Sequence, residues 1–293
     1  MPNTRQIRQQ IRSVTNTARI TSAMELIAGA KMRRAQQRVI EARPYSEKLI
    51  EVLAELTQSN SESLEDLHPF LEEREQGKFT VIQFTPNRGL CGGLNSNLNK
   101  AAYEFYQSQD GEGSFISAGK KGKDYISRRN VPILGEYSDL GDFPSPEDLV
   151  PLSSRFIEDY LNEDTDKVYL VYAQFVNTGV QKPVVKQLLP IAPDQFLTAK
   201  NNSGRTYNYE YEPDVNSVLG SLLPRYIEMQ VYQAALENAA SEQSARMVAM
   251  RSATDAAGEM MEDLNLKYNK ARQETITSEL LDLVGGVAAL ENK

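Results

Sequence analysis

Two segments at opposite ends of this 293-residue chain carry the same heptad pattern. Near the N-terminus, alternating steps of four and three residues connect Ile7, Ile11, Val14, Ala18, Thr21, Glu25, Ala28, Met32, Ala35, Val39 and Ala42. Near the C-terminus the same steps connect Leu236, Ala240, Gln243, Met247, Met250, Thr254, Ala257, Met261, Leu264, Tyr268 and Ala271. Such spacing keeps one stripe of a helix turned toward a partner helix. The two segments can pair only if the chain folds back on itself, so we expect a long antiparallel coiled coil with a globular insert.

The charge is divided unevenly along the chain. Residues 1–48 carry ten Lys/Arg against three Asp/Glu, a net charge of +7. Residues 49–213 carry fifteen against twenty-five, and residues 214–286 carry six against eleven, so the rest of the chain is acidic. A basic first helix and an acidic last helix attract each other when they are antiparallel. Nucleic acid is not an expected partner, because most of the chain is acidic and no recognition module is visible.

The residue types needed for metal or thiol chemistry are scarce. The chain has one cysteine, Cys91, which excludes an intramolecular disulfide and suits a reducing cytoplasm. Its one histidine, His68, leaves little material for metal sites with several histidines or for catalytic pairs. No apolar run is long enough to span a bilayer, and the start lacks a signal-peptide apolar region. The composition therefore gives little support to a metal site with several histidines or to a His-dependent catalytic pair.

The coarse pattern predicts an α/β fold with five segments. They are a coiled-coil helix over 1–58, an acidic linker over 59–77, a central Rossmann-like α/β domain over 78–212, a second coiled-coil helix over 213–286, and a tail over 287–293. Pro44 is expected to bend or divide the first helix, and Pro224 to kink the second or mark its start. Gly285-Gly286 is expected to end the second helix.

Strands and helices alternate in the middle of the chain. The expected strands are Lys78–Thr85, Ser114–Ala118, Val131–Leu134, Lys167–Phe175, Val184–Leu189 and Thr206–Tyr211. The expected helices are Asn95–Gln107, Lys121–Arg129 and Ser145–Leu161. This alternation is typical of an α/β layer.

Two glycine-containing turns invite comparison with phosphate-binding loops. Gly89–Gly93 follows a strand and opens a helix, and Gly119–Lys123 is rich in lysine. Neither has the spacing of the dinucleotide fingerprint or of the P-loop. We interpret both as structural turns, and Cys91 as a small core or turn residue.

Several motifs resemble the gamma subunit of the rotary F-type ATP synthase. They are residues 11–26 (IRSVTNTARITSAMEL), 30–35 (AKMRRA), 43–45 (RPY), 89–95 (GLCGGLN), 240–250 (ASEQSARMVAM), 268–273 (YNKARQ) and 276–279 (ITSE) with Gly285-Gly286. They span essentially the whole chain in order. The segment from Val185 to Tyr211 is short and has no cysteine, so the resemblance is to the bacterial type, without the regulatory insert of cyanobacteria and chloroplasts.

The resemblance implies a non-catalytic rotor shaft, with no catalytic residues, no cofactor and no metal site of its own. The terminal helices would enter the ring of alpha and beta subunits, and the central domain would bind the epsilon subunit and contact the membrane ring of c subunits. Ion flow would turn that ring, and the asymmetric shaft would change the affinities of the catalytic sites on beta. The complex would lie on the cytoplasmic face of the bacterial membrane, with this chain bound peripherally.

The resemblance also implies a set of subunit-contact residues. Met24 would lie at the bearing contact with beta, and Arg33 and Arg34 would face acidic beta segments. Five residues of the last helix would interact with this bearing contact or with the catch loops of beta: Arg246, Arg272, Gln273, Thr277 and Glu279. We also hypothesise that the polar stripe residues Glu25, Gln243 and Thr254 reflect a hairpin that must face a surrounding ring.

Two other functions stay open from the residues alone. The first is a free coiled-coil adaptor whose middle domain binds a ligand. The second is a nucleotide-dependent enzyme that uses the turn Gly89–Gly93.

Overall fold

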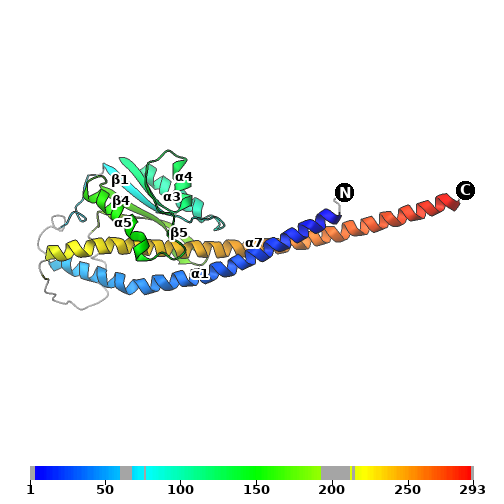
Figure 1. Ribbon diagram of the computed structural model, residues 1–293, viewed down its shortest axis with the longest axis horizontal. Helices are drawn as coiled ribbons and strands as arrows, with labels where there is room; N and C mark the ends of the chain where they lie inside the picture. Colours follow the sequence, from blue (N-terminus) through cyan, green and yellow to red (C-terminus); the bar gives the residue numbers. More distant parts are fainter. Residues whose placement is uncertain (1–3, 60–67, 76, 193–211, 213–214, 292–293) are drawn as a thin grey trace. The chain divides into compact units, whose positions relative to one another are not determined.

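A computed structural model describes residues 4–59, 68–75, 77–192, 212 and 215–291 (Figure 1). The contacts divide the chain into two compact units. The coiled-coil unit comprises Met1–Ile27 with Met247–Lys293, and the α/β unit comprises Ala28–Arg246. Helices α1 (Thr4–Ser59) and α7 (Val215–Glu291) contribute residues to both units.

The heptad stripes are the buried faces of the two long helices. Every stripe residue from Ile7 to Ala42 and from Leu236 to Ala271 is buried or half-buried, whereas most residues between them on the coiled-coil helices are exposed. Three side-chain contacts fix the direction of pairing inside the coiled-coil unit. Thr21 Oγ1 lies 2.7 Å from Thr254 Oγ1, Thr15 Oγ1 lies 3.2 Å from Met261 Sδ, and Arg8 Nη2 lies 2.5 Å from the Tyr268 hydroxyl. As the residue number falls along α1 it rises along α7, so the predicted antiparallel coiled coil is confirmed.

The prolines do not divide the long helices. Pro44 lies inside the continuous helix α1, and Pro224 lies nine residues into α7, which begins at Val215. A proline removes the donor to the carbonyl four residues earlier, which for Pro44 is that of Ile40. Ile40 is 58% exposed, so a water molecule can donate a hydrogen bond to its carbonyl in place of the missing amide.

The second helix also continues past its predicted end. The structure extends α7 to Glu291, so the predicted stop at Gly285-Gly286 is wrong. A glycine pair ends a helix only where the chain gains a capping turn or a new direction, and glycine alone costs a helix about 1 kcal/mol.

A five-stranded sheet forms the centre of the α/β unit. Its strands are β1 (Lys78–Phe84), β2 (Glu112–Ala118), β3 (Ile133–Glu136), β4 (Lys167–Asn177) and β5 (Val180–Leu189), in the order β3-β2-β1-β4-β5. The pairs among β3, β2, β1 and β4 are parallel, and β5 is antiparallel to β4. The predicted α/β class with a Rossmann-like domain is therefore confirmed. The predicted strand Thr206–Tyr211 lies outside the described residues.

Helices cover both faces of the sheet (Figure 1). Helix α5 (Pro146–Leu161) and parts of α1 and α7 pack on one face, where Leu53, Phe156 and Ile227 are fully buried. Helices α3 (Leu94–Ser108) and α4 (Lys120–Ser127) pack on the other, around Phe79 and Phe115. The sheet is thus buried on both sides, as parallel sheets require, and α7 belongs to its core.

Candidate subunit-contact surfaces

The turn Gly89–Gly93 connects β1 to α3 and is held by packing. Cys91 is 1% exposed and packs against Leu94, Leu98, Ala173 and Ala245. Asn95 Nδ2 lies 3.3 Å from the Cys91 sulfur and donates to the Arg88 carbonyl at 3.4 Å. Burial raises the pKa of the Cys91 thiol, which lowers its reactivity. The thiol has the structural role that the sequence predicted.

The turn before α4 is also structural. Gly119 has φ +128, and a Cβ atom there would lie 1.9 Å from the Thr85 carbonyl oxygen. The glycine therefore allows two backbones to meet, and the amides of Lys120 and Gly122 that follow it are bonded within the chain, to Asn87 and Thr85.

Helix α7 fills the place where an open α/β sheet normally binds its ligand. That place is the carboxyl end of the parallel strands at the point where the strand order reverses, here beside β1 and β4. Ser241 Oγ donates to the Ala173 carbonyl at 2.9 Å, and the Ala173 amide donates to Asn238 Oδ1 at 3.3 Å. The cavity left next to these residues measures about 40 Å³. Small-molecule sites are usually about 300–1,000 Å³, so the structure argues against the nucleotide-enzyme hypothesis.

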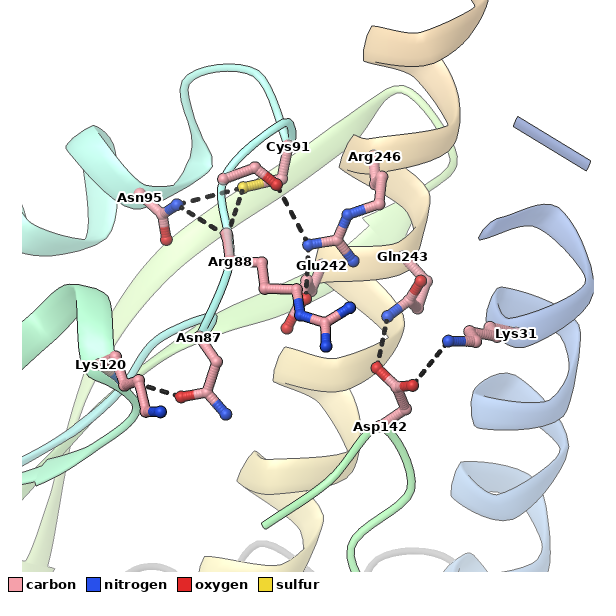
Figure 2. Close-up of polar contacts among 11 residues, drawn as sticks. Lys31, Asn87, Arg88, Cys91, Asn95, Lys120, Asp142, Glu242, Gln243 and Arg246 are labelled. Atoms are coloured by element: carbon pink, nitrogen blue, oxygen red, sulfur yellow. Dashed lines mark hydrogen bonds and ion pairs between the residues drawn. The ribbon is translucent and has the colours of Figure 1, made fainter. Parts of the chain in front are cut away.

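Arg246 is fixed to its own chain (Figure 2). Its guanidinium forms an ion pair of 2.7 Å with Glu242 and donates to the Gly89 carbonyl at 3.4 Å. Only 12% of the Arg246 side chain is exposed, and burial raises the pKa of Glu242 while Arg246 opposes that rise. Both contacts use Nη2, so this nitrogen connects α7 to the turn after β1.

Asp142 connects the two long helices within the α/β unit (Figure 2). It accepts from Lys31 Nζ of α1 at 2.6 Å and from Gln243 Nε2 of α7 at 3.4 Å. The stripe residue Gln243 is 2% exposed, and Thr254 is bonded to Thr21. Gln243 and Thr254 thus have partners inside the chain that account for their polarity without a surrounding ring, while the hypothesis stays a prediction for the half-buried Glu25.

The contact residues predicted on α1 differ in exposure. Met24 is half-buried in the coiled-coil unit, where Ile20 and Leu26 are 61% and 71% exposed. Arg33 and Arg34 are both exposed in the α/β unit, and no ion pair involves either of them in the described part of the chain. Met24 thus lies beside an exposed apolar surface, and the two arginines are open to solvent.

The last part of α7 has no partner from α1. Following the register, the start of α1 at Thr4 lies opposite a residue near Arg272. Arg272, Gln273, Thr277 and Glu279 are all exposed. So are six large apolar side chains, at 48% to 67%: Ile276, Leu280, Leu281, Leu283, Val284 and Val287. Met24 lies opposite residues near 251, about 30 Å along the helix from Arg272 at 1.5 Å per residue, so the structure does not bring Met24 to this end of α7.

Comparison with known proteins decides the family. The ATP synthase family profile matches residues 3–290. The ATP synthase gamma chain of Dehalococcoides mccartyi is 49% identical over 290 residues, which cover 99% of this chain and 100% of that protein. The gamma chain of Herpetosiphon aurantiacus is 46% identical over 300 residues, with 99% of each chain covered. The chain belongs to the ATP synthase gamma chain family.

Solved structures share the fold at much lower identity. A chain in the structure of the Euglena gracilis mitochondrial ATP synthase (OSCP/F1/c-ring, rotational state 3) aligns with a TM-score of 0.67 and 20% identity, covering 98% of this chain and 94% of that one. A chain in the central stalk and c-ring of the Tetrahymena thermophila enzyme gives 0.59 and 22%, covering 80% and 99%.

Family membership establishes the general role. A gamma chain is a non-catalytic subunit of ATP synthase and belongs to its central stalk, or rotor, so the function predicted from the sequence is confirmed. Among the residues that the structure describes, no helix has the length and apolarity needed to cross a bilayer. Within the same ranges, no three acidic, His or Cys side chains converge on a possible metal site.

Sequence reasoning missed the contacts that connect this gamma chain internally. Asp142 lies in a loop with no motif, and only the buried polar heptad position Gln243 gave a signal that a partner was needed. Glu242 lies in the motif at residues 240–250. The signal that could have predicted its ion pair with Arg246 is the spacing of four residues on one helix.

Proposed function

We propose that this chain is the shaft that couples ion-driven rotation of the membrane ring to conformational changes at the catalytic sites of the beta subunits. The observation that carries the proposal is the unpaired end of α7. Its six large apolar side chains would be costly to expose to water, so they require a covering surface. A collar of surrounding subunits supplies such a surface, while a free adaptor does not.

We propose further that the exposed residues near this end contact beta. Arg272, Gln273, Thr277 and Glu279 offer charged and polar groups that can be exchanged between successive partners without deep anchoring. Met24 would act beside the exposed Ile20 and Leu26 as an adaptable apolar contact. Arg33 and Arg34 would pair with acidic segments, whereas Arg246 would act mainly by holding α7 to the turn after β1.

We propose that the partners are the alpha, beta and epsilon subunits and the ring of c subunits, on the cytoplasmic face of a bacterial membrane. Functionally, the chain divides into the coiled-coil helices 1–58 and 213–286, the linker 59–77, the central domain 78–212 and the end 287–293. The gamma chains of bacteria to which this chain is similar support this assignment, as does the α/β core into which α7 packs.

Deleting Thr277–Lys293 tests the proposal. Coupled ATP synthesis in vesicles that carry the assembled complex is expected to fall severalfold, while the unfolding midpoint of the α/β unit stays unchanged, because the deleted residues lie outside that unit. A matched control replaces exposed polar residues of the same segment, as in Ser278→Ala with Asp282→Asn. Unchanged coupled synthesis by the truncated chain would rule out the contact roles assigned to this segment.

The adaptor hypothesis makes a different prediction. A shaft co-purifies with alpha and beta subunits in a fixed stoichiometry and carries no tightly held ligand of its own in the middle domain. A stable monomer with no affinity for these subunits would favour the adaptor.

A further inference from the structure

A cavity of about 480 Å³ lies inside the α/β unit, between the sheet and the two long helices. Small organic molecules usually occupy sites of about 300–1,000 Å³. The apolar lining of the cavity comes from Ile50 of α1, Leu170 of β4 and Ala234 of α7. The polar lining consists of one lysine, two tyrosines and two glutamines: Lys186, Tyr172, Tyr226, Gln230 and Gln233. Lys186 is the one charged residue among the described residues of the lining.

The register of the sheet turns Lys186 toward this cavity. In the pairing of β4 with β5, Lys186 lies directly opposite Leu170, so both side chains are on the same face of the sheet. Tyr172 is two residues from Leu170 and shares that face. Leu170 and Tyr172 pack in one core with Leu53 of α1 and Ile227 of α7, so this is the face that the long helices cover. The Lys186 side chain therefore extends along an apolar wall instead of into bulk water.

The amine of Lys186 has a neutral partner. Lys186 is half-buried, its Nζ donates to Gln230 Oε1 at 2.6 Å, and it forms no ion pair in the described part of the chain. One neutral acceptor replaces the hydration of an ammonium group poorly, so burial lowers the pKa of Lys186, while the charge of Glu237 opposes this fall. The bond to Gln230 uses an N–H, so the lone pair of the neutral amine stays free to attack an electrophile.

The other titratable groups at the cavity do not compete with this amine. Burial raises the pKa values of Tyr172 and Tyr226 to about 12, so both hydroxyls stay protonated at neutral pH. The carboxylate whose charge acts on Lys186 is that of Glu237 on α7, and Arg43 of α1 acts on Glu237 in turn. Among the described residues of the lining, the Lys186 amine is therefore the one group that can react as a nucleophile near neutral pH.

We propose that Lys186 binds a small aldehyde with an apolar body, reversibly and as an imine. The Nζ lone pair adds to the carbonyl carbon, and a proton passes from the nitrogen to the carbonyl oxygen, which gives a carbinolamine. Loss of one water molecule then forms the C=N bond. The reaction needs no oxidant or reductant, and water reverses it. The apolar body packs against Ile50, Leu170 and Ala234. The proposal does not depend on the rotor function.

The probe is benzaldehyde, added to the full-length chain with cyanoborohydride, which reduces an imine to a stable benzyl amine. Peptide mass spectrometry then measures the label at each lysine. At about pH 7.5 an ordinary exposed lysine has only about 0.1% neutral amine, so Lys186 is expected to be labelled at least about fivefold faster than Lys182, which is exposed on the same strand. Labelling of Lys186 that is no faster than that of Lys182 would overturn the proposal. In urea the two lysines are expected to react equally, and a preference that survives unfolding would also overturn it, because the cavity would then have no part in the reaction.

A competitor locates the aldehyde in the cavity. Benzyl alcohol has the same apolar body but no carbonyl group, so it can fill the cavity without reacting. In excess it is expected to slow the labelling of Lys186 at least about twofold and to leave that of Lys182 unchanged. Equal effects on the two lysines, or no effect on either, would overturn the assignment of the aldehyde to this cavity.

A variant tests the state of the reacting amine. Glu237→Gln removes the carboxylate that opposes the fall in the pKa of Lys186, so it is expected to speed the labelling of Lys186 at least about twofold at the same pH. Glu259→Gln, exposed on the same helix, is the charge-matched control and is expected to change nothing. Equal labelling rates in the two variants would overturn the neutral amine as the reacting group.

Discussion

At the residue scale, three polar residues of the heptad stripes, Thr21, Gln243 and Thr254, each find a partner within the chain. Thr21 is 8% exposed, and its hydroxyl contacts both Thr254 and the Thr17 carbonyl. Gln243 and Asp142 form a similar pair in the α/β unit. Thr21, Thr254 and Gln243 interrupt the heptads with their polar groups paired, which is why the long helices tolerate them.

Replacing the threonine pair with valines tests this balance. Thr21→Val or Thr254→Val alone is expected to change the free energy of unfolding by at most about 1 kcal/mol, because the remaining hydroxyl keeps its helical carbonyl partner. The double variant is expected to be as stable as the unchanged chain or more stable, since two apolar groups then face each other. Urea unfolding of the four proteins measures this cycle, and additive losses would contradict it.

Gly119 is the residue at which the fold is least tolerant of a side chain. Gly119→Ala is expected to destabilise the α/β unit by about 3 kcal/mol or more, since the new Cβ meets the Thr85 carbonyl and φ is +128. Gly93→Ala is the control, because its Cβ would approach only the end of the Asn97 side chain, at 3.7 Å. Thermal unfolding followed by circular dichroism distinguishes the two, and equal melting temperatures would show that the turn can relax.

The half-buried Glu237 makes stability depend on pH. Burial raises its pKa, so the folded chain holds this proton more tightly than the unfolded chain does. The stabilisation from Glu237 is therefore present at pH 4.5 and below, and it is lost as the pH rises through the folded pKa. Relative to the unchanged chain, Glu237→Gln is expected to gain stability between pH 4.5 and pH 7. The exposed control Glu259→Gln is expected to show a constant difference over the same range.

At the element scale, periodicity determined what could be predicted. The heptads located both buried stripes, and the helix predicted over Asn95–Gln107 differs from α3 by one residue at each end. The start of β5 was missed because Pro183 lies inside the strand, and proline is unusual in strands. It is tolerated here because β5 is at the edge of the sheet.

Contacts between distant elements could not be predicted in this way. Asp142, Lys31 and Gln243 are far apart in sequence, and no pattern in their own segments indicates that they meet. The same holds for Ser153, whose unpaired hydroxyl follows from the packing of α5 and not from its place in the heptad or strand patterns. The exposed contact residues were indicated only by resemblance, because exposure leaves no periodic signal.

A buried hydroxyl of α7 binds the turn of the β4–β5 hairpin. Ser244 is fully buried, and its Oγ donates to the Thr178 carbonyl at 2.8 Å. Ser244→Ala is expected to cost about 0.5–1.5 kcal/mol, because the Thr178 carbonyl loses one of its two donors and keeps the other, Gln181 Nε2, at 3.0 Å. Hydrogen exchange is expected to accelerate at Asn177–Val180 while β1 stays protected. Uniform acceleration across the sheet would mean that α7, and not the hairpin alone, had loosened.

At the scale of the whole molecule, the two units differ in how they are stabilised. The α/β unit has a core on each face of the sheet, whereas the coiled-coil unit has only the contact of two helices. Beyond Ala271, α7 lacks even that contact, since every described side chain there is exposed. Stability should therefore fall from the α/β unit to the paired helices, and from these to the unpaired end of α7.

Limited proteolysis tests this order and the proposed collar together. Trypsin is expected to cut the free chain first at Lys270 and Arg272, where α7 loses its partner, and to leave the α/β unit intact. In the complex with alpha and beta subunits the same bonds are expected to resist cleavage, because the six exposed apolar residues are then covered. A free chain that resists trypsin at these positions would mean that the end of α7 is stable without a partner. Cleavage at equal rates in the free and assembled chain would mean that the end is not enclosed by the collar, and the shaft assignment would then need another contact surface.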